Sequence, residues 1–208
     1  MNNAQITDIG KDVVKREITS LESLYTAFPY GFAEAVQHIL HELKGKVVVT
    51  AMGKPGYIAH RFAATLSSTG VPAVYLHSAE ASHGDMGIIS DDDCVIAMSY
   101  SGETKEMFDV IDYTRRFGVK LVAICSNPNS TLGKNADINV TIPRVEETCT
   151  IGKAPTVSAI LLSTIANAFI YALEHESGLT PDSYHNWHPH GALGVSLLKV
   201  SAIMHTGG

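Results

Sequence analysis

The stretch CVIAMSYSGET, residues 94–104, joins an unbroken apolar run to a turn of hydroxyl side chains around one glycine. The run CVIAMS (94–99) is short and does not alternate with polar residues, which is typical of a parallel strand buried on both faces. Amphipathic spacing then predicts a helix from Glu103 to Phe117. A strand, a polar turn and a helix in this order indicate one unit of an α/β fold, in which ligands bind beyond the carboxyl ends of the strands.

The same pattern recurs along the chain. Three more apolar runs and one weaker, alternating run predict further strands: KVVVTAM (46–52), PAVYLH (72–77), KLVAICS (120–126) and DINVTIP (137–143). Helical spacing separates them, as from Tyr57 to Ser68. We therefore expect an α/β protein, a three-layer αβα sandwich with a mostly parallel five-stranded sheet of the flavodoxin-like kind.

Helices are also expected outside the sheet region. Two leading helices, from Ile6 to about Ala27 and from Gly31 to Leu43, divide the chain into N-terminal helices (1–44) that pack on a core domain (45–208). The helix over 156–177 is apolar nearly all round, which favours burial in a homo-oligomer over the alternative, an internal helix of a monomer. From Leu179 onwards we expect a loop-rich tail.

Composition excludes several classes of protein. The chain has 208 residues, 45% hydrophobic residues and a net charge of −6, which disfavours nucleic acid as a partner. Cys94, Cys125 and Cys149 have no metal-binding spacing and are expected to be reduced thiols, the first two of them buried. The N-terminus does not resemble a signal peptide, and we expect that no apolar run approaches the ~20 residues of a membrane span. We expect a cytoplasmic protein without membrane contact, and read Asp91–Asp93 as a solvated turn.

The hydroxyl-rich turn after residue 98 is the best candidate for an anion site. Ser99, Ser101 and Thr104 surround Gly102 where a helix begins, and free N–H groups at a helix start favour phosphate. The alternative is that Ser101 or Thr104 only caps that helix. Neither this turn nor the Gly53-Lys54-Pro55-Gly56 turn matches a Walker or dinucleotide fingerprint, which disfavours ATP and NAD, and no cofactor is expected.

Four segments resemble one family. SYSGET (99–104) is similar to the phosphate loop of the SIS (sugar isomerase) domain family, and AEASHGDMGII (79–89), ETCTIGKAPTVSA (147–159) and HPHGALG (188–194) resemble its arabinose-5-phosphate isomerase branch. That branch commonly carries a pair of CBS domains after the last motif, and we expect a single-domain form lacking them. Three departures, Pro55, Thr150 and His190, leave the substrate preference open.

The resemblance implies an aldose-ketose isomerase that interconverts D-arabinose 5-phosphate and D-ribulose 5-phosphate through a cis-enediol, for synthesis of 3-deoxy-manno-octulosonate (Kdo) in lipopolysaccharide. Gly53 and the phosphate-loop residues Ser99, Ser101, Gly102 and Thr104 would bind the phosphate. Further implied partners are other copies of the chain in a homotetramer, and a nucleotide sugar such as CMP-Kdo as inhibitor.

The resemblance and the positions of the residues also suggest catalytic groups: Lys54, His83, Glu106, Glu147 and His188. Either carboxylate could be the base and either histidine the acid, and His188 could complete a neighbouring subunit's pocket. The alternatives are a solvated surface lysine and histidines held by backbone hydrogen bonds. His185, His188 and His190 lack nearby carboxylate or cysteine support, so no metal site is expected.

Two other functions remain open at this point. One is a non-catalytic SIS sensor that binds a sugar phosphate and controls a partner, although the chain has no basic helix-turn-helix segment. The other is an SIS enzyme for a hexulose or heptose phosphate, against which the H-G-D and H-P-x-G-A-L-G segments argue.

Overall fold

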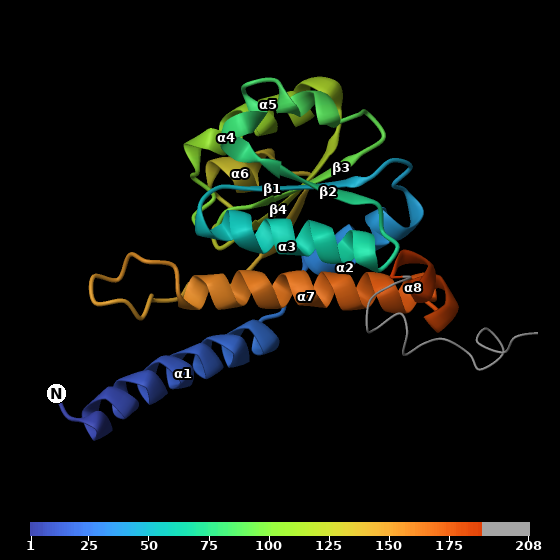
Figure 1. Cartoon of the computed structure of the whole chain (residues 1–208). Helices are drawn as coiled ribbons and strands as arrows, with labels where there is room; N and C mark the ends of the chain where they lie inside the picture. Colours follow the sequence, from blue (N-terminus) through green and yellow to red (C-terminus); the bar gives the residue numbers. More distant parts are fainter. Residues whose placement is uncertain (189–208) are drawn as a thin grey trace, which may run out of the picture.

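A single sheet of five parallel strands forms the centre of the molecule (Figure 1). The structure is a computed structural model and describes residues 1–188. The strands lie in the order β2-β1-β3-β4-β5 and have these bounds: β1 Val47–Ala51, β2 Ala73–His77, β3 Cys94–Met98, β4 Lys120–Cys125 and β5 Ile138–Thr141. The predicted α/β class and number of strands are confirmed, and the sheet is wholly rather than mostly parallel.

Helices cover both faces of the sheet, which confirms the three-layer sandwich (Figure 1). One face carries the three helices α4 (Ser78–Ala81), α5 (Phe108–Phe117) and α6 (Thr131–Asn135). The other carries α2 (Gly31–His41) and α3 (Lys54–Ser68). Two further helices stack outside this second layer: α7 (Val157–Ser177) packs on α2 and α3, and α1 (Asn3–Thr26) packs on α7.

The continuous apolar runs of the strands are explained by burial on both faces. Val47 and Val49 face the core shared with α2, α3 and α7, whereas Val48 between them faces the core under α5. Every residue of β1 and β3 is buried. Cys94 and Cys125 are buried free thiols, as expected, and burial raises the pKa of Cys94 to about 12.

The 21 residues of α7 are long and apolar enough to cross a membrane by length and composition, with a mean hydropathy of 1.6 over its most apolar window. The expectation that no apolar run approaches the length of a membrane span is therefore wrong for this helix. Half of that window is buried inside the chain, and Leu161, Phe169 and Leu173 are fully enclosed. This packing is that of a core helix, although Tyr171 on its outer face is 68% exposed.

The first helix projects from the body over much of its length (Figure 1). Asn2 and Gln5 form a capping box at its start, but Ser20 and Leu24 are the only residues of α1 that are buried. The exposed fractions of Ile6, Ile9 and Ile18 exceed one half. An apolar stripe on α1 is therefore left without a covering element within residues 1–188.

Two local predictions from the sequence were wrong, the start of one helix and the exposure of Asp93, and the structure adds two short elements that the sequence did not predict. The helix predicted from Glu103 begins at Phe108, after a single 3-10 turn, η2 (Lys105–Met107), because side-chain hydrogen bonds hold residues 99–104 in a turn and bind Glu103 to Thr131. The tail after Leu179 contains a short helix, α8 (Pro181–Trp187), which starts with a capping box. A short 3-10 turn, η1 (Asp85–Ile88), also follows α4.

Asp93 is the second wrong prediction, because it is only 3% exposed rather than part of a solvated turn. Its carboxylate accepts hydrogen bonds from the Lys46 Nζ at 2.7 Å and from the backbone N–H groups of Lys46 and Ser90, each at 2.8 Å. Burial alone would raise the pKa of Asp93, but these hydrogen bonds outweigh it and lower the pKa. Asp93 thus fixes the starts of β1 and β3 to one another.

Candidate active site

The segment 99–104, which we call the phosphate loop, follows the carboxyl end of β3. Met98 at the end of β3 pairs with Ala51 at the end of β1, so the phosphate loop and the Gly53-Lys54 turn follow neighbouring strands. The chain leaves β1 toward α3 on one face and leaves β3 toward α5 on the other. The chain connections therefore change from one face of the sheet to the other between the neighbouring strands β1 and β3. Open α/β sheets bind ligands at such a switch point, beyond the carboxyl ends of the strands.

Hydroxyl groups hold the phosphate loop in shape. Ser99 Oγ lies 2.8 Å from Thr104 Oγ1 and also accepts a hydrogen bond from the backbone N–H of Gly102 at 3.1 Å. Gly102 has a φ of +71°, and a Cβ added there would lie 2.0 Å from Ser130 Oγ. Only glycine fits at that position, as expected of a tight turn around an anion site.

The phosphate loop has backbone N–H groups that could donate hydrogen bonds to a ligand. The Glu103 carboxylate accepts hydrogen bonds from the Thr131 N–H at 2.9 Å and from Thr131 Oγ1 at 2.7 Å, and these bonds lower the pKa of Glu103. Ser101 is exposed and accepts a hydrogen bond from the Glu103 N–H at 3.2 Å. Within residues 1–188 the backbone N–H groups of Ser101 and Thr104 have no acceptor. Free N–H groups beside hydroxyls form a cradle suited to an anion.

Lys54 is the first residue of α3. Gly53 caps this helix with a φ of +65°, and Lys54 is exposed at the helix start. Pro55 fits the first turn, where its missing N–H would have had no partner within the helix. The lysine and the positive end of the helix dipole thus lie on the same edge of the sheet as the phosphate loop.

The two predicted carboxylates have different environments. Glu106 lies on η2, directly after the phosphate loop, and is exposed. Glu147 is partly buried, and its Oε2 accepts hydrogen bonds from the Thr156 N–H at 2.7 Å, from Thr156 Oγ1 at 2.9 Å and from the Ser158 N–H at 3.3 Å. Burial raises the pKa of Glu147, but the hydrogen bonds from Ser158 and Thr156 outweigh it and lower the pKa.

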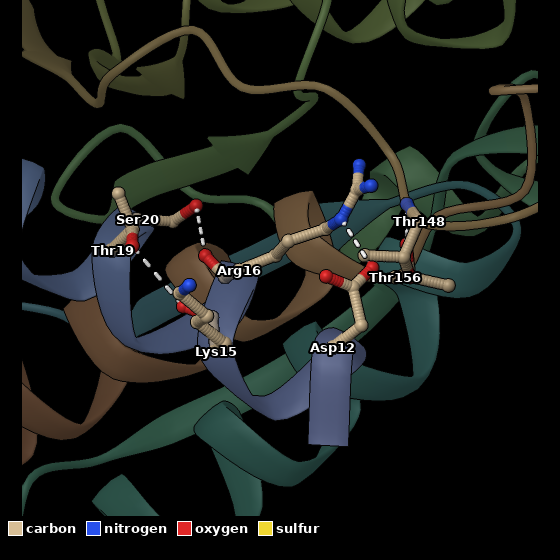
Figure 2. Close-up of polar contacts among 7 residues, drawn as sticks. All are labelled: Asp12, Lys15, Arg16, Thr19, Ser20, Thr148 and Thr156. Atoms are coloured by element: carbon tan, nitrogen blue, oxygen red, sulfur yellow. Dashed lines mark hydrogen bonds and ion pairs between the residues drawn. The ribbon is translucent and has the colours of Figure 1, made fainter. Parts of the chain in front are cut away.

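Glu147 therefore anchors the start of α7. Thr148 is also hydrogen-bonded to the start of α7, because its N–H and its hydroxyl lie 2.9 and 3.0 Å from Thr156 Oγ1 (Figure 2). A hollow of about 300 Å³ lies between α1 and the neighbouring Val145 and Glu146. A carboxylate held in this way with a lowered pKa is a weak base.

The two predicted histidines lie in different places. His83 follows α4 and is exposed. His188 stacks on Tyr184 at 4.1 Å and its Nδ1 lies 3.0 Å from the Tyr184 carbonyl oxygen. The adjacent Trp187 packs against Gly70, just before the amino end of β2, where a Cβ would lie 2.4 Å from its ring.

His188 thus lies near the amino ends of the strands, whereas the phosphate loop follows the carboxyl end of β3. The helix α7 begins beside the Glu147 anchor and ends near α8, and 21 residues of helix span about 30 Å. The structure brings Lys54 and Glu106 to the phosphate-loop edge of one chain and does not bring His188 there. His190 and the remainder of the HPHGALG motif lie outside the described residues. Among residues 1–188, no three His, Cys, Asp or Glu side chains are grouped to hold a metal ion.

Sequence reasoning missed three aromatic residues near this edge. Tyr75 and His77 of β2 and His60 of α3 line a hollow of about 300 Å³ beside Gly53. His77 ends the quoted strand PAVYLH, so the rule that ligands bind at the carboxyl ends of strands could have found it.

Curated proteins are similar to this chain over most of its length. The arabinose 5-phosphate isomerase KdsD of Yersinia pestis is 42% identical over 199 residues, which are 95% of this chain and 60% of the relative. The KdsD of Pseudomonas aeruginosa is 38% identical over 211 residues, and the match covers 100% of this chain and 64% of the relative. The chain therefore spans about three fifths of the length of these curated relatives.

One solved structure is similar over its whole length. The Escherichia coli CFT073 protein c3406, in complex with arabinose 5-phosphate, has a TM-score of 0.87 and 32% identity, and the match covers 91% of this chain and 100% of that one. The family model of the SIS domain matches residues 39–172. This match covers well over half of the sequence, and the chain belongs to the SIS domain family.

Proposed function

We propose that the chain is an aldose-ketose isomerase that interconverts D-arabinose 5-phosphate and D-ribulose 5-phosphate. The observation that carries the proposal is the cradle of hydroxyls and free N–H groups at residues 99–104, across the switch point from Lys54. The relatives named arabinose 5-phosphate isomerase and the neighbour solved with arabinose 5-phosphate support this choice of substrate.

The reaction moves one proton between C2 and C1. A base removes the C2 proton of the open-chain aldose, the freed electron pair forms the C1–C2 double bond, and the C1–oxygen double bond breaks as the C1 oxygen takes a proton, which gives a cis-enediol. The C2 hydroxyl then loses its proton and becomes the carbonyl, while the electron pair of the C1–C2 double bond takes up a proton at C1. Negative charge develops on oxygen in between. Lys54, an exposed cation at the start of α3, is suited to stabilise that charge.

Glu106 is the better candidate for the base. It follows the phosphate loop directly and has no hydrogen-bond partner among the described residues, so its carboxylate is free to take a proton. Glu147 is engaged at the start of α7 and acts in this account as a positioning residue. His83 and His188 are the candidates for the acid that carries protons between the two oxygens.

The proposed site includes His188 of a second copy, and the distance of about one length of α7 between His188 and the Glu147 anchor of the same chain supports this part of the proposal. The exposed apolar side chains of α1 and the outer face of α7 offer surfaces for assembly, and we include a homotetramer in the proposal. We also propose a cytoplasmic enzyme that supplies Kdo synthesis, with CMP-Kdo as an inhibitor to be tested.

A direct assay tests the proposal. The protein is incubated with ribulose 5-phosphate, and arabinose 5-phosphate is quantified by chromatography, with and without CMP-Kdo. Ribose 5-phosphate and glucose 6-phosphate serve as alternative substrates. Turnover of ribulose 5-phosphate that is lost in Glu106→Gln supports the proposal, and the absence of turnover with the folded wild-type protein rejects it.

A further inference from the structure

A carboxylate lies within the loop that is proposed to bind phosphate. Glu103 stands between Gly102 and Thr104. An unattached carboxylate at this place would repel an anion, and it would accept hydrogen bonds from the same backbone N–H groups that the anion needs. The position of the Glu103 side chain therefore matters for any anion site at this loop.

The Glu103 carboxylate is bonded to residues 126–132, which run from the end of β4 into α6. The Thr131 N–H donates to Oε1 at 2.9 Å and the Thr131 hydroxyl donates to Oε2 at 2.7 Å, so both carboxylate oxygens have a donor. These two bonds, and to a smaller extent the charge of Lys134, lower the pKa of Glu103. Glu103 therefore stays ionised, and its negative charge is held at Thr131.

The same segment, residues 126–132, binds two backbone acceptors of the phosphate loop. The Tyr100 carbonyl oxygen accepts hydrogen bonds from the Ser126 N–H at 2.8 Å and from Ser126 Oγ at 2.7 Å. The Gly102 carbonyl oxygen accepts a hydrogen bond from the Leu132 N–H at 3.0 Å. Two carbonyl groups and one carboxylate of the loop therefore face residues 126–132.

The free N–H group of Ser101 faces the opposite way. In a planar trans peptide, the N–H of one residue points away from the C=O of the residue before it. The peptide bond between Tyr100 and Ser101 is trans, and the Tyr100 C=O points to Ser126, so the Ser101 N–H is directed away from Ser126. The loop thus has acceptors on one side and a free donor on the other, which is the polarity that an anion site requires.

We propose that Glu103 is a positioning residue for phosphate binding, because its carboxylate, held by Thr131, fastens the loop to residues 126–132 and keeps a negative charge away from the donors that face the phosphate. This inference rests on the proposed function and adds to it two residues that act through the phosphate loop. Affinity for a phosphoryl group then depends on where the charge of Glu103 is held.

Shortening the side chain separates the charge from its position. Glu103→Asp keeps the charge but is one methylene shorter than the span to Thr131, and an aspartate readily accepts hydrogen bonds from nearby backbone N–H groups, which are the donors that phosphate needs. Glu103→Ala removes the charge and the bonds together. Glu103→Gln removes the charge and keeps an oxygen that can accept from the Thr131 N–H. Glu34→Asp, at an exposed position of α2, is the matched control.

Equilibrium binding by calorimetry tests this with the full chain. Arabinose 5-phosphate and inorganic phosphate are titrated into the wild type and each variant, and thermal melting checks that each variant is folded. We expect Glu103→Asp to weaken both ligands about tenfold and Glu103→Ala about threefold, whereas Glu103→Gln and Glu34→Asp change them by less than about twofold. In steady-state kinetics, Glu103→Asp should raise the KM and leave the kcat nearly unchanged.

Variants of Thr131 test whether the charge is the cause. Thr131→Ser keeps both donors and should bind both ligands as the wild type does. Thr131→Val loses the hydroxyl donor and should weaken both ligands about threefold. The same change made together with Glu103→Gln should have no further effect, because no charge is then released.

The order of the variants decides the outcome. A loss in folded Glu103→Asp no greater than the loss in Glu103→Ala overturns the inference, since the position of the charge would then have no effect. A loss for arabinose 5-phosphate without one for inorganic phosphate also overturns it, as does an equal effect of Thr131→Val with and without Glu103→Gln. Binding in the expected order without any turnover would reject the proposed function and leave this inference standing.

Discussion

The phenol of Tyr100, within the phosphate loop, accepts a hydrogen bond from the backbone N–H of Val145 at 2.6 Å and lies 3.2 Å from its carbonyl oxygen. Val145 precedes Glu147, which anchors the start of α7. A single side chain thus connects the phosphate cradle to the segment that carries the second predicted carboxylate. We expect the shape of the cradle to depend on that connection.

Replacing Tyr100 by Phe should loosen the cradle. The Val145 N–H loses its acceptor, so we expect the free energy of unfolding to fall by about 1–3 kcal/mol and the KM for the sugar phosphate to rise. Tyr113→Phe is the control, because it removes a hydroxyl that donates to the Ile89 carbonyl oxygen at 3.2 Å, away from the loop. Urea unfolding and steady-state kinetics measure the two effects. An unchanged KM in Tyr100→Phe would contradict the connection.

The two carboxylates should separate catalysis from stability. Glu106→Gln changes an exposed side chain, so we expect stability within about 0.5 kcal/mol of the wild type and a loss of about 10²- to 10⁴-fold in kcat. Glu147→Gln removes a charged acceptor at a helix start and should cost about 1–3 kcal/mol of stability. Denaturation and turnover of both variants check this. The reverse pattern would make Glu147 the base.

Asp93 should control part of the acid stability. Its folded-state pKa is lowered, so the stability it contributes is present above the unfolded value of about 3.9 and is lost as the pH falls through the lower, folded value. Asp93→Asn should therefore cost about 2–3 kcal/mol at pH 7 and much less at the lowest pH that keeps the chain folded. Urea midpoints from pH 7 to pH 3 measure this difference. A cost that does not change with pH would show that the charge of Asp93 is not responsible.

Two inactive variants should restore activity when mixed. If His188 completes the pocket of a neighbouring copy, Glu106→Gln and His188→Gln chains, unfolded and refolded together, form some sites in which both residues are intact. We expect each variant alone to be nearly inactive and the mixture to recover a measurable fraction of wild-type turnover. Size-exclusion chromatography with light scattering gives the oligomeric state of each sample.

A mixture as inactive as its components would place both residues in one pocket of one chain, against the separation of about one length of α7 seen here. Mixing Glu106→Gln with Lys54→Met is the control. Both residues lie at the phosphate-loop edge of the same chain, so this pair should not restore activity.

The sheet was predictable because its signal is local. Apolar runs that do not alternate, as in residues 46–52 and 94–99, require burial on both faces, and this determined the class of fold. The start of α5 was not predictable in this way. Glu103 has good helical spacing, but a bond to Thr131, 28 residues away, holds it outside the helix. Asp93 was misread for the same reason, because its partner Lys46 is distant in sequence.

The site was predictable as a set of residue types rather than as an arrangement. Ser99, Gly102 and Thr104 form the expected cradle. The sequence could not reveal that the Glu147 carboxylate accepts hydrogen bonds at the start of α7, because this depends on the path of the loop between Glu147 and Thr156. The long helix before His188 did suggest that this residue serves a neighbouring copy, and α7 does lead the chain away from the phosphate loop.

Proton exchange at C2 tests the central claim most directly. Arabinose 5-phosphate is incubated in D₂O with the wild type, Glu106→Gln and Glu147→Gln, and the loss of the C2 proton signal is followed by NMR. The account expects exchange with the wild type, slower exchange with Glu147→Gln, and none above background with Glu106→Gln. Exchange at the wild-type rate in Glu106→Gln, or no exchange with the wild-type protein, would contradict it.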